Sequence, residues 1–456
     1  MSLIKSVSGI RGTIGGQPGD NLTPQDIVSF VSAYGAWLKR DFTGQSVVVG
    51  RDGRISGEMV KNLVISTLQA MGIDVIDLDY STTPSVEMYV IQSGASGGII
   101  ITASHNPAEW NALKFLNHRG EFISPEAGEE IKQMAESGSK DVTYAGVNHL
   151  GRILPVNDAI DQHVLAILEH PLVDARVISD ARLKVVVDCI NSTGAISIPP
   201  LLEALGVDYT LINGEVTGQF AHNPEPLPQH LTQLCEAVVN QNAHLGISVD
   251  PDVDRLAFVA DDGIFFGEEY TLVCVADYVL KHRKGPLVTN LSSSRALADL
   301  AATYDVPCFF APVGEVHVVN EMKVQGAVLG GEGNGGVIDP TLHYGRDALI
   351  GIALVLMHLA ASKKTLTELK STYPKYEMVK DKISFDPSLS PQALLDKVAD
   401  HFRSEKLDTR DGLKVDFESS WVQLRKSNTE PILRIYAEAK TMDEAKILVE
   451  KVKKLL

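Results

Sequence analysis

A serine follows an apolar run in the segment Gly98–Lys114, which reads GIIITASHNPAEWNALK. The run Gly97–Ile101 has the composition of a buried strand, and Ser104 stands in the short polar tip after it. Serine is a weak nucleophile at its free pKa and needs a neighbouring base or prior activation. His105 is adjacent, and Lys114 lies ten residues further on. The pattern predicts covalent chemistry at Ser104.

A second apolar run, Leu245–Val249, ends in an acidic tip. Asp250, Asp252 and Asp254 stand at alternate positions after it. Three carboxylates with this spacing can converge their oxygens on a hard divalent cation. Together the two tips suggest that Ser104 carries phosphate beside a magnesium ion.

Each motif has a simpler or rival interpretation. For Ser104 these are a helix N-cap and the nucleophile of a Ser-His-carboxylate hydrolase. Two observations disfavour the hydrolase: adjacent side chains on a strand point to opposite faces, and no GxSxG elbow surrounds the serine. For the aspartates they are a solvated acidic turn and an EF-hand loop, which requires glycine at position six and glutamate at position twelve. Those positions hold Arg255 and Asp261, which disfavours calcium.

Two later segments are suited to a phosphorylated ligand. Gly331–Gly336 reads GEGNGG, which fits a flexible turn and also a dinucleotide GxGxxG loop, although the helix start and the later acidic residue of such a loop are not convincing. Arg425–Pro431 reads RKSNTEP, with Arg434 close behind. Cations, hydroxyls and backbone donors in one loop favour a phosphate anchor over a charged surface turn. Arg11 in SGIRG is expected at the site, and Arg51 in GRDGR is left open between a site role and a structural one.

SGIRG, TASHNP, DPDVDR, GEGNGG and RKSNTEP follow one another along the chain. In this order and spacing they resemble the signature segments of the α-D-phosphohexomutases, which include phosphoglucomutases, phosphomannomutases and phosphoglucosamine mutases. The resemblance covers nearly the whole chain. It implies that the phosphate of Ser104 passes to the sugar and forms a hexose 1,6-bisphosphate, which turns over and returns its other phosphate to the enzyme.

The resemblance also implies roles for individual residues. Mg²⁺ is expected to bind a phosphoserine oxygen at Ser104 and the carboxylates of Asp250, Asp252 and Asp254, where it would neutralise charge on the transferring phosphoryl group. The implied catalytic residues are Ser104, His105, Lys114, Arg255 and Arg11. The implied substrate-binding residues are Glu332, Asn334, Arg425, Ser427, Asn428, Thr429 and Arg434.

The chain departs from the family pattern within GEGNGG. Many members carry serine where this chain has Asn334 and histidine where it has Gly336. Without that histidine, the candidates to handle the sugar's proton are Lys114, His105 and His343. This variant resembles the archaeal-type phosphoglucosamine mutases.

Alternating strand and helix patterns position these tips. Strands are predicted at Ser46–Val49, Ile73–Leu78, Lys184–Cys189 and Pro286–Asn290, besides the runs before Ser104 and Asp250. Helices are predicted at Gln25–Arg40, Glu58–Met71, Pro125–Glu136, Ile196–Leu205, Glu268–His282 and Arg346–Ser362. Three such groups with polar strand tips predict three similar α/β domains.

The pattern changes after about residue 372. Strands are predicted at Gly412–Phe417, Trp421–Leu424 and Ile432–Ala437, and helices at Pro391–Ser404 and Met442–Leu456. We therefore expect an α/β protein with mixed sheets and a smaller C-terminal α+β domain around a central cleft. The expected domains are 1–153 with the phosphoserine loop, 154–255 with the metal loop, 256–371 with the sugar loop and 372–456 with the phosphate loop. A hinge is expected near Ser371–Lys380.

Composition limits the partners. The net charge of −17 argues against general nucleic-acid binding and requires a locally basic site for an anionic substrate. No apolar stretch approaches the roughly 20 residues that span a bilayer, and the first residues lack the apolar core of a secretory signal. The four cysteines are scattered without a CxxC pair. We expect a cytoplasmic monomer or homodimer with reduced thiols and no membrane partner.

The sequence therefore predicts a Mg²⁺-dependent phosphosugar mutase of the isomerase class. Glucosamine phosphate is the expected sugar, and a phosphomannomutase/phosphoglucomutase of broad hexose specificity is the first alternative. A catalytically silent sugar-phosphate-binding protein and a phosphatase that loses its phosphoserine to water are the remaining alternatives.

Overall fold

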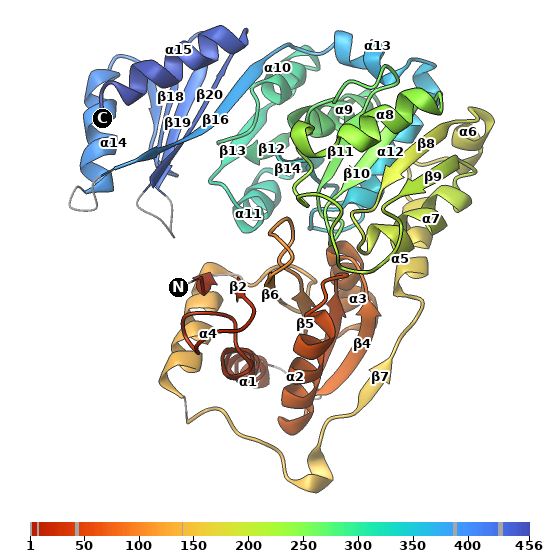
Figure 1. Cartoon of the computed structure of the whole chain (residues 1–456), viewed down its shortest axis with the longest axis vertical. Helices are drawn as coiled ribbons and strands as arrows, with labels where there is room; N and C mark the ends of the chain where they lie inside the picture. The colour runs from red at the N-terminus through yellow and green to blue at the C-terminus, as the bar shows by residue number, and fades with distance from the viewer. Residues whose placement is uncertain (1, 7–8, 42–44, 139, 386–389, 427–431) are drawn as a thin grey trace. The chain divides into compact units, whose positions relative to one another are not determined.

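The computed structural model describes residues 2–6, 9–41, 45–138, 140–385, 390–426 and 432–456 (Figure 1). The chain divides into two compact units. The first unit is made of Met1–His282 and Asn334–Ser371, and the second of Arg283–Gly333 and Thr372–Leu456. Neither unit is continuous in sequence, because the chain passes between them at residues 282/283, 333/334 and 371/372.

The first unit begins with a seven-stranded sheet in the order β1-β2-β6-β5-β3-β4-β7. Its strands are β1 (Ile4–Ser6), β2 (Gly9–Thr13), β3 (Ser46–Arg51), β4 (Asp74–Tyr80), β5 (Gly97–Ile101), β6 (Trp110–Leu116) and β7 (Ile153–Pro155). β3 pairs in parallel with β4 and β5, and β4 with β7. β2 pairs antiparallel with β1 and β6, and β5 antiparallel with β6, so the sheet is mixed.

Helices cover both faces of this sheet (Figure 1). Val47 and Val49 of β3 share a core with residues of α1 (Pro24–Asp41), α2 (Gly57–Ala70) and α4 (Pro125–Ser137). Val48 faces the other way and shares a core with residues of α3 (Thr83–Ser93). Successive strand side chains alternate between faces, so a strand that is covered on both must be apolar at nearly every position. This explains the unbroken apolar runs of β3 and β5.

The second sheet of the first unit has the order β11-β10-β8-β9. Its strands are β8 (Lys184–Asp188), β9 (Asp208–Ile212), β10 (Leu245–Val249) and β11 (Leu256–Val259). β8 pairs in parallel with β9 and β10, whereas β10 and β11 are antiparallel. The segment DPDVDR is therefore the tight connection between two antiparallel strands.

The rest of the first unit is mostly helical. Its elements are η1 (Val147–His149), α5 (Ala159–Leu168), α6 (Ala175–Asp180), α7 (Gly194–Ala204), η2 (Pro228–His230), α8 (Thr232–Asn240), α9 (Glu268–His282), β15 (Gly336–Ile338), α12 (Ala348–Ser362) and α13 (Leu366–Ser371). α9 and α12 pack against each other and are buried along most of their length. A helix that is apolar on all sides requires such burial.

The second unit contains parallel strands in the order β13-β12-β14. They are β12 (Leu287–Asn290), β13 (Cys308–Ala311) and β14 (Leu329–Glu332), connected by α10 (Ala296–Thr303) and α11 (Glu315–Gln325). This βαβ alternation fits the α/β domain predicted for the third group of elements, and it brings the three strands into a parallel arrangement.

An antiparallel sheet completes the second unit in the order β16-β20-β19-β18-β17. Its elements are β16 (Glu377–Ser384), α14 (Pro391–His401), β17 (Lys406–Asp408), β18 (Leu413–Asp416), β19 (Trp421–Lys426), β20 (Ile432–Ala439) and α15 (Met442–Lys453). Both helices contribute apolar side chains to a core with the sheet. Thr441 and Glu444 form a capping box that starts α15.

The structure confirms the predicted strand and helix patterns and corrects several ends. The helix predicted at Arg346–Ser362 begins at Ala348, because Asp347 caps it by accepting hydrogen bonds from the amides of Leu349 and Ile350. The C-terminal helix ends at Lys453. The sequence patterns did not predict a number of other elements, among them α3, β6, α5, α8 and α11. No described helix is long and apolar enough to cross a membrane.

Candidate active site

Ser104 lies just beyond β5. Its φ of +49° is in the left-handed region, which a non-glycine residue enters at an energetic cost. The Ser104 amide donates to Thr102 Oγ1 (2.9 Å), and Thr102 Oγ1 donates to Asp52 Oδ2 (2.6 Å). Because the chain leaves the strand here, His105 Nδ1 lies 3.4 Å from Ser104 Oγ. The argument that strand alternation separates these two side chains is therefore wrong.

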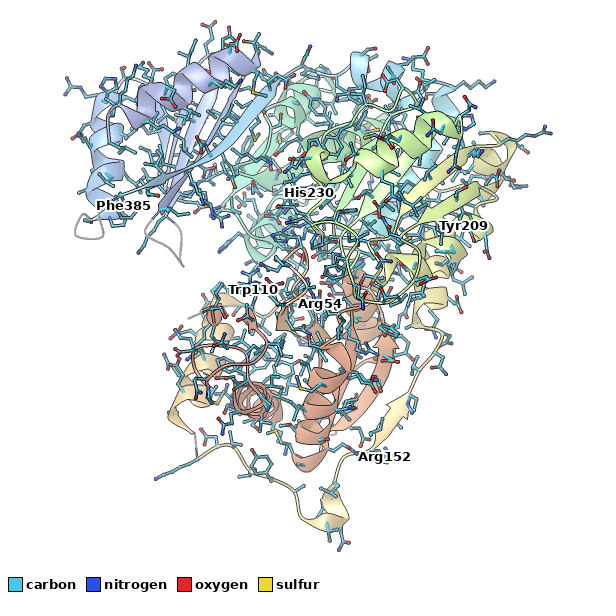
Figure 2. All side chains as sticks on the ribbon, viewed as in Figure 1. Arg54, Trp110, Arg152, Tyr209, His230 and Phe385 are labelled. Carbon is cyan, nitrogen blue, oxygen red and sulfur yellow. The ribbon has the colours of Figure 1, made fainter. Side chains whose placement is uncertain are left out.

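Arg54 is the main anchor of this loop, and its side chain is fully buried (Figure 2). Its guanidinium donates to the carbonyl oxygens of Ser104 (2.6 Å), Asn106 (2.7 Å), Pro107 (2.6 Å) and Trp110 (2.9 Å) and to Asp52 Oδ2 (3.0 Å). A planar fork with five donors can serve all these acceptors, and an ammonium group with three cannot. The reactive loop is thus shaped by one arginine.

Sequence reasoning missed Arg54, although it belongs to the GRDGR segment. It weighed Arg51 instead, which pairs with Asp79 (2.8 Å) and lies over the ring of Tyr80 (3.8 Å). The structure thus shows structural contacts for Arg51. The sequence marks Arg54 only as the second arginine of this motif. Most of its acceptors are backbone carbonyls, which leave no pattern of residue types in the sequence.

The connection after β10 brings its first aspartate to the serine. Ser104 Oγ donates to Asp250 Oδ2 (2.6 Å), while Asp250 Oδ1 accepts from the amides of Asp254 (3.2 Å) and Arg255 (3.1 Å). Val253 has φ +62°, which is rare for a β-branched residue and marks a strained turn. One oxygen from each of the three aspartates lies within 4.8 Å of the others.

The other two aspartates each use one oxygen for protein contacts. Asp252 Oδ2 accepts from Lys114 Nζ (2.7 Å) and Thr83 Oγ1 (2.6 Å), and Asp254 Oδ2 accepts from Arg346 (2.6 Å). The Oδ1 atoms of both are buried without a hydrogen-bond partner in the part of the chain that the structure describes. A buried carboxylate oxygen is costly in that state, so these atoms fit a cation. An all-oxygen set suits a hard ion such as Mg²⁺.

Burial and mutual repulsion decide the charge states. Burial, followed by the carboxylates of Asp252 and Asp254, raises the pKa of Asp250 well above its usual value. Burial also acts to raise the pKa of Asp254, but nearby cations, Arg346 first, outweigh it and lower this pKa. Burial acts to lower the pKa of Lys114, but its two carboxylate partners raise it overall. Lys114 is therefore an ammonium ion.

The other predicted catalytic residues lie around the serine. Arg11 donates to Asn106 Oδ1 (3.2 Å) in the Ser104 loop, and Arg255 lies near Glu225 Oε1 (3.5 Å). Burial, followed by Arg255 and Arg11, lowers the pKa of His105 well below its usual value. Its imidazole is neutral at pH 7.

The predicted sugar contacts come from both units. Glu332, in the second unit, is buried, and its Oε1 accepts from Asn290 Nδ2 (2.8 Å) and from the amide of Gly314 (3.1 Å). Asn334, in the first unit, accepts from the amide of Gly336 (3.2 Å). A sugar-binding role for either residue stays a prediction.

The predicted phosphate anchor contains an unusual pair. Arg425 of β19 and Arg434 of β20 are directly opposite each other in the antiparallel ladder. Like charges in this position are destabilising unless counter-charges offset them. Asp411 Oδ2 lies 2.8 Å from Arg425 Nε and offsets part of this charge. Three further predicted residues, Ser427, Asn428 and Thr429, lie outside the described residues.

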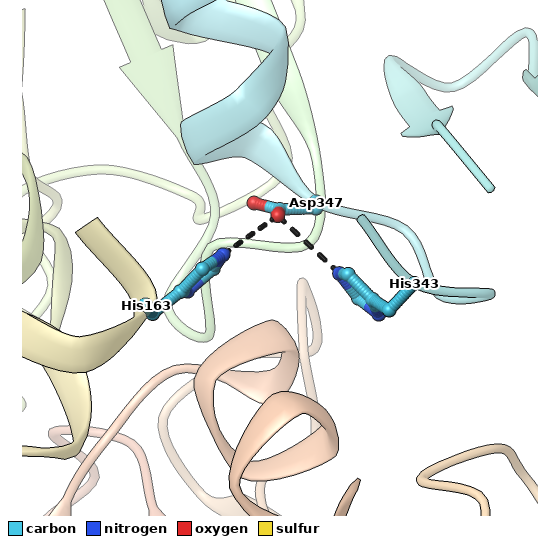
Figure 3. A group of neighbouring side chains, drawn as sticks. All are labelled: His163, His343 and Asp347. Atoms are coloured by element: carbon cyan, nitrogen blue, oxygen red, sulfur yellow. Dashed lines mark hydrogen bonds and ion pairs between the residues drawn. The ribbon is translucent and has the colours of Figure 1, made fainter. Parts of the chain in front are cut away.

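His343, a candidate for the sugar's proton, is buried in another cluster. Figure 3 shows the rings of His163 and His343 on either side of Asp347. Their Nε2 atoms lie 2.9 Å and 3.3 Å from Asp347 Oδ2, and His343 Nδ1 lies 3.5 Å from Glu87 Oε2. The three side chains could hold a metal ion, but the hydrogen bonds and the helix cap already account for their geometry. Both ring nitrogens of His343 thus lie beside carboxylates, Asp347 and Glu87.

Four domain descriptions of one family match consecutive parts of the chain. Domains I, II and III of the phosphoglucomutase/phosphomannomutase α/β/α type match residues 3–141, 161–263 and 267–376, and the C-terminal domain matches 379–455. The chain belongs to the phosphoglucomutase/phosphomannomutase family. It is a phosphohexomutase, an enzyme of the isomerase class. The predicted fold class, three α/β domains and a smaller C-terminal domain, is confirmed.

Relatives of this phosphohexomutase are similar over their full length. A phosphoglucomutase/phosphomannomutase of Thermococcus kodakarensis is 36% identical over 452 residues, which cover 98% of each chain. A phosphoglucosamine/phosphogalactosamine mutase of Sulfurisphaera tokodaii is 31% identical over 100% of this chain and 99% of its own. The solved structure of a phosphoglucomutase/phosphomannomutase family protein from Burkholderia thailandensis matches with a TM-score of 0.85 and 24% identity, covering 100% of this chain and 98% of that one.

Proposed function

We propose that this phosphohexomutase interconverts hexose 1-phosphate and hexose 6-phosphate through a phosphate on Ser104 and a hexose 1,6-bisphosphate. Asp250, Asp252, Asp254 and a phosphoserine oxygen would hold Mg²⁺, which supplies charge neutralisation at the transferring phosphoryl group. The supporting observation is the 2.6 Å contact of Ser104 Oγ with Asp250, beside two buried carboxylate oxygens that have no partner among the described residues.

In the transfer step, a sugar hydroxyl attacks the phosphorus on Ser104. The sugar O–P bond forms as the Ser104 O–P bond breaks, and the hydroxyl proton must reach Ser104 Oγ. His105 is neutral and lies 3.4 Å from that oxygen, so it relays the proton, while Lys114 remains an ammonium ion and stabilises charge. The second step reverses these bonds at the other end of the bisphosphate.

The remaining predicted residues hold the substrate and its phosphate groups in place. Arg425 and Arg434 anchor the phosphate that is not transferred, together with Ser427, Asn428 and Thr429. Their cross-strand placement supports an anion site, because an anion relieves the repulsion between them. Glu332 and Asn334 contact sugar hydroxyls, and Arg11 and Arg255 stabilise the transferring phosphoryl group.

Glucosamine phosphate is the proposed preferred sugar. Asn334 and Gly336 resemble the archaeal-type phosphoglucosamine mutases, and the Sulfurisphaera relative carries that activity in its name. The name of the Thermococcus relative supports the alternative, a phosphomannomutase/phosphoglucomutase of broader specificity. A cytoplasmic location and a monomeric or homodimeric state remain predictions.

The mechanism is tested by Ser104→Ala, with Ser93→Ala as the control because Ser93 is exposed and its hydroxyl donates to backbone carbonyls of its own helix. Wild type and Ser93→Ala should exchange phosphate between protein and bisphosphate and should show one phosphate by intact mass. Ser104→Ala should do neither. A fully active Ser104→Ala would exclude the mechanism.

The sugar is tested by kcat/KM on glucosamine, glucose and mannose 1-phosphates, each with Mg²⁺ and a trace of bisphosphate. We expect glucosamine 1-phosphate to be favoured about ten-fold, or roughly 1.4 kcal/mol of transition-state discrimination. Equal or higher rates on glucose and mannose would exclude the glucosamine preference and leave the mutase mechanism intact.

A further inference from the structure

Gly336 has no backbone reason to be glycine. It is not among the residues with positive φ, so its conformation is open to other amino acids. A Cβ at this position would, however, lie 2.3 Å from Cδ and 3.0 Å from Cγ of Arg346. The stem of one arginine fills the space that a side chain at position 336 would need.

Arg346 is nearly buried and is held at its far end. Its NH2 group donates to Asp254 Oδ2 at 2.6 Å, and the Asp254 side chain is fully buried. The arginine therefore cannot simply swing away from position 336, because its guanidinium would leave a buried carboxylate. The positions of Gly336, Arg346 and Asp254, all in the first compact unit, therefore depend on one another.

The main chain beside Arg346 is also held. Asp347, the next residue, caps α12 and accepts hydrogen bonds from His163 and His343 (Figure 3). The direction in which Arg346 leaves the backbone is thus set by a buried network. Both ends of this side chain are constrained.

The proposed site concentrates negative charge. Three aspartates and a phosphoserine of about −2 charge lie against one divalent ion, so cationic side chains must offset the excess. Lys114 and Arg346 donate to the carboxylates of Asp252 and Asp254 and supply part of that positive charge. The hydrogen bond of Arg346 to Oδ2 also leaves Asp254 Oδ1 as the buried oxygen without a described partner.

We propose that Arg346 is a positioning residue of the metal centre, and that Gly336 is glycine so that this side chain can reach Asp254. Arg346 holds the carboxylate so that Oδ1 faces the cation. This inference rests on the proposed function, because it requires a divalent ion at the three aspartates. Removing such a partner of a metal ligand typically weakens metal affinity about 10- to 100-fold.

The test is direct Mn²⁺ binding, measured from the free-ion signal in electron paramagnetic resonance. Arg346→Gln and Gly336→Ala should each weaken binding about ten-fold or more. Gly336→Ala should do so although the charged groups of Arg346 and Asp254 are both still present. The double variant should be no weaker than Arg346→Gln alone, because the glycine acts through the arginine. Arg346→Lys should fall between wild type and Arg346→Gln. Arg152→Gln, which alters an exposed pair with Asp74, should bind like the wild type.

Activity provides a second readout. Arg346→Gln should need more Mg²⁺ for half-maximal rate and recover most of kcat at saturating Mg²⁺, which a variant with a collapsed fold would not do. Binding by Arg346→Gln that equals or exceeds the wild type would overturn the proposal and leave the mutase mechanism standing. A wild type that binds no Mn²⁺ would overturn the metal site and this inference together.

Discussion

Lys114 and His105 lie near the same serine, but Lys114 is positively charged and His105 is neutral. Lys114 donates to Asp252 (2.7 Å) and Asp254 (3.4 Å), which keep it protonated. Desolvation, followed by the nearby guanidinium groups of Arg255 and Arg11, lowers the pKa of His105 and keeps it neutral. The neighbours of each residue thus set the charge state on which its proposed role depends.

Under the proposed mechanism, Lys114→Met should lower kcat/KM by about 100-fold or more, because it removes the ammonium ion proposed to stabilise the transferring phosphoryl group. His105→Gln should lower kcat by about 100- to 10,000-fold, the range of a general acid–base group. Steady-state assays at saturating Mg²⁺ measure both. Lys132→Met on α4 is the control, because Lys132 forms a surface pair with Glu129 within its own helix. Wild-type rates in Lys114→Met would contradict the assigned role.

At the scale of elements, the loop after β5 has no regular secondary structure and is ordered by side chains from another segment. Arg54, in the segment between β3 and α2, supplies the donors for three of its carbonyls and for the carbonyl of Trp110, the first residue of β6. A loop without regular secondary structure needs such support to hold Ser104 in a fixed position, because unsatisfied buried carbonyls are costly.

Arg54→Ala should lower the free energy of unfolding of the first unit by about 3–5 kcal/mol, because Asp52 and the loop carbonyls lose a buried partner. Arg152→Ala should change it by at most about 1 kcal/mol, since the Arg152 side chain is 75% exposed (Figure 2). Urea unfolding of the two variants provides the comparison. Similar losses in both would show that burial of Arg54 is not what stabilises the loop.

His222 introduces a pH dependence into the loop that carries Glu225. Burial acts to lower its pKa, but Asp188 at 2.9 Å outweighs burial and the pKa is raised. Stabilisation by this pair is full below the unfolded pKa of about 6.5 and is lost as pH rises through the raised folded value. His222→Gln should therefore destabilise the protein more at pH 6 than at pH 9, by roughly 1 kcal/mol. Urea midpoints that differ equally at both pH values would contradict this prediction.

At the scale of the whole molecule, each of the two compact units consists of two separate segments of the chain. Each has its own apolar cores, such as that around β3 and β5 in the first unit and that under β18, β19 and β20 in the second. Units with separate cores need not unfold in one step.

Differential scanning calorimetry should therefore resolve at least two transitions. Leu424→Ala in β19 should lower one of them and Ile99→Ala in β5 the other, because each removes a fully buried side chain, at a cost of about 2–5 kcal/mol. A single transition that both substitutions shift equally would show that the units unfold as one.

The sequence by itself determined the family and the strand ends on which the proposed chemistry is argued. Ser104 and the three aspartates follow apolar runs that can be recognised without a structure, because a strand covered on both faces must be apolar and its tip need not be. Strand and helix types were predictable for the same reason, since periodicity depends on residues close together in sequence.

Only the tertiary structure decided which distant side chains complete the site. Arg54 contacts the loop carbonyls 50 to 56 residues away, and Arg346 contacts Asp254 across 92 residues and fills the space at Gly336. It also places His105 next to Ser104, contrary to the expectation from strand alternation, because the left-handed turn is held by the Thr102 hydroxyl, which donates to Asp52, and by Arg54, which donates to the Ser104 carbonyl. Contacts of this kind are set by packing between elements, and no local pattern in the chain records them.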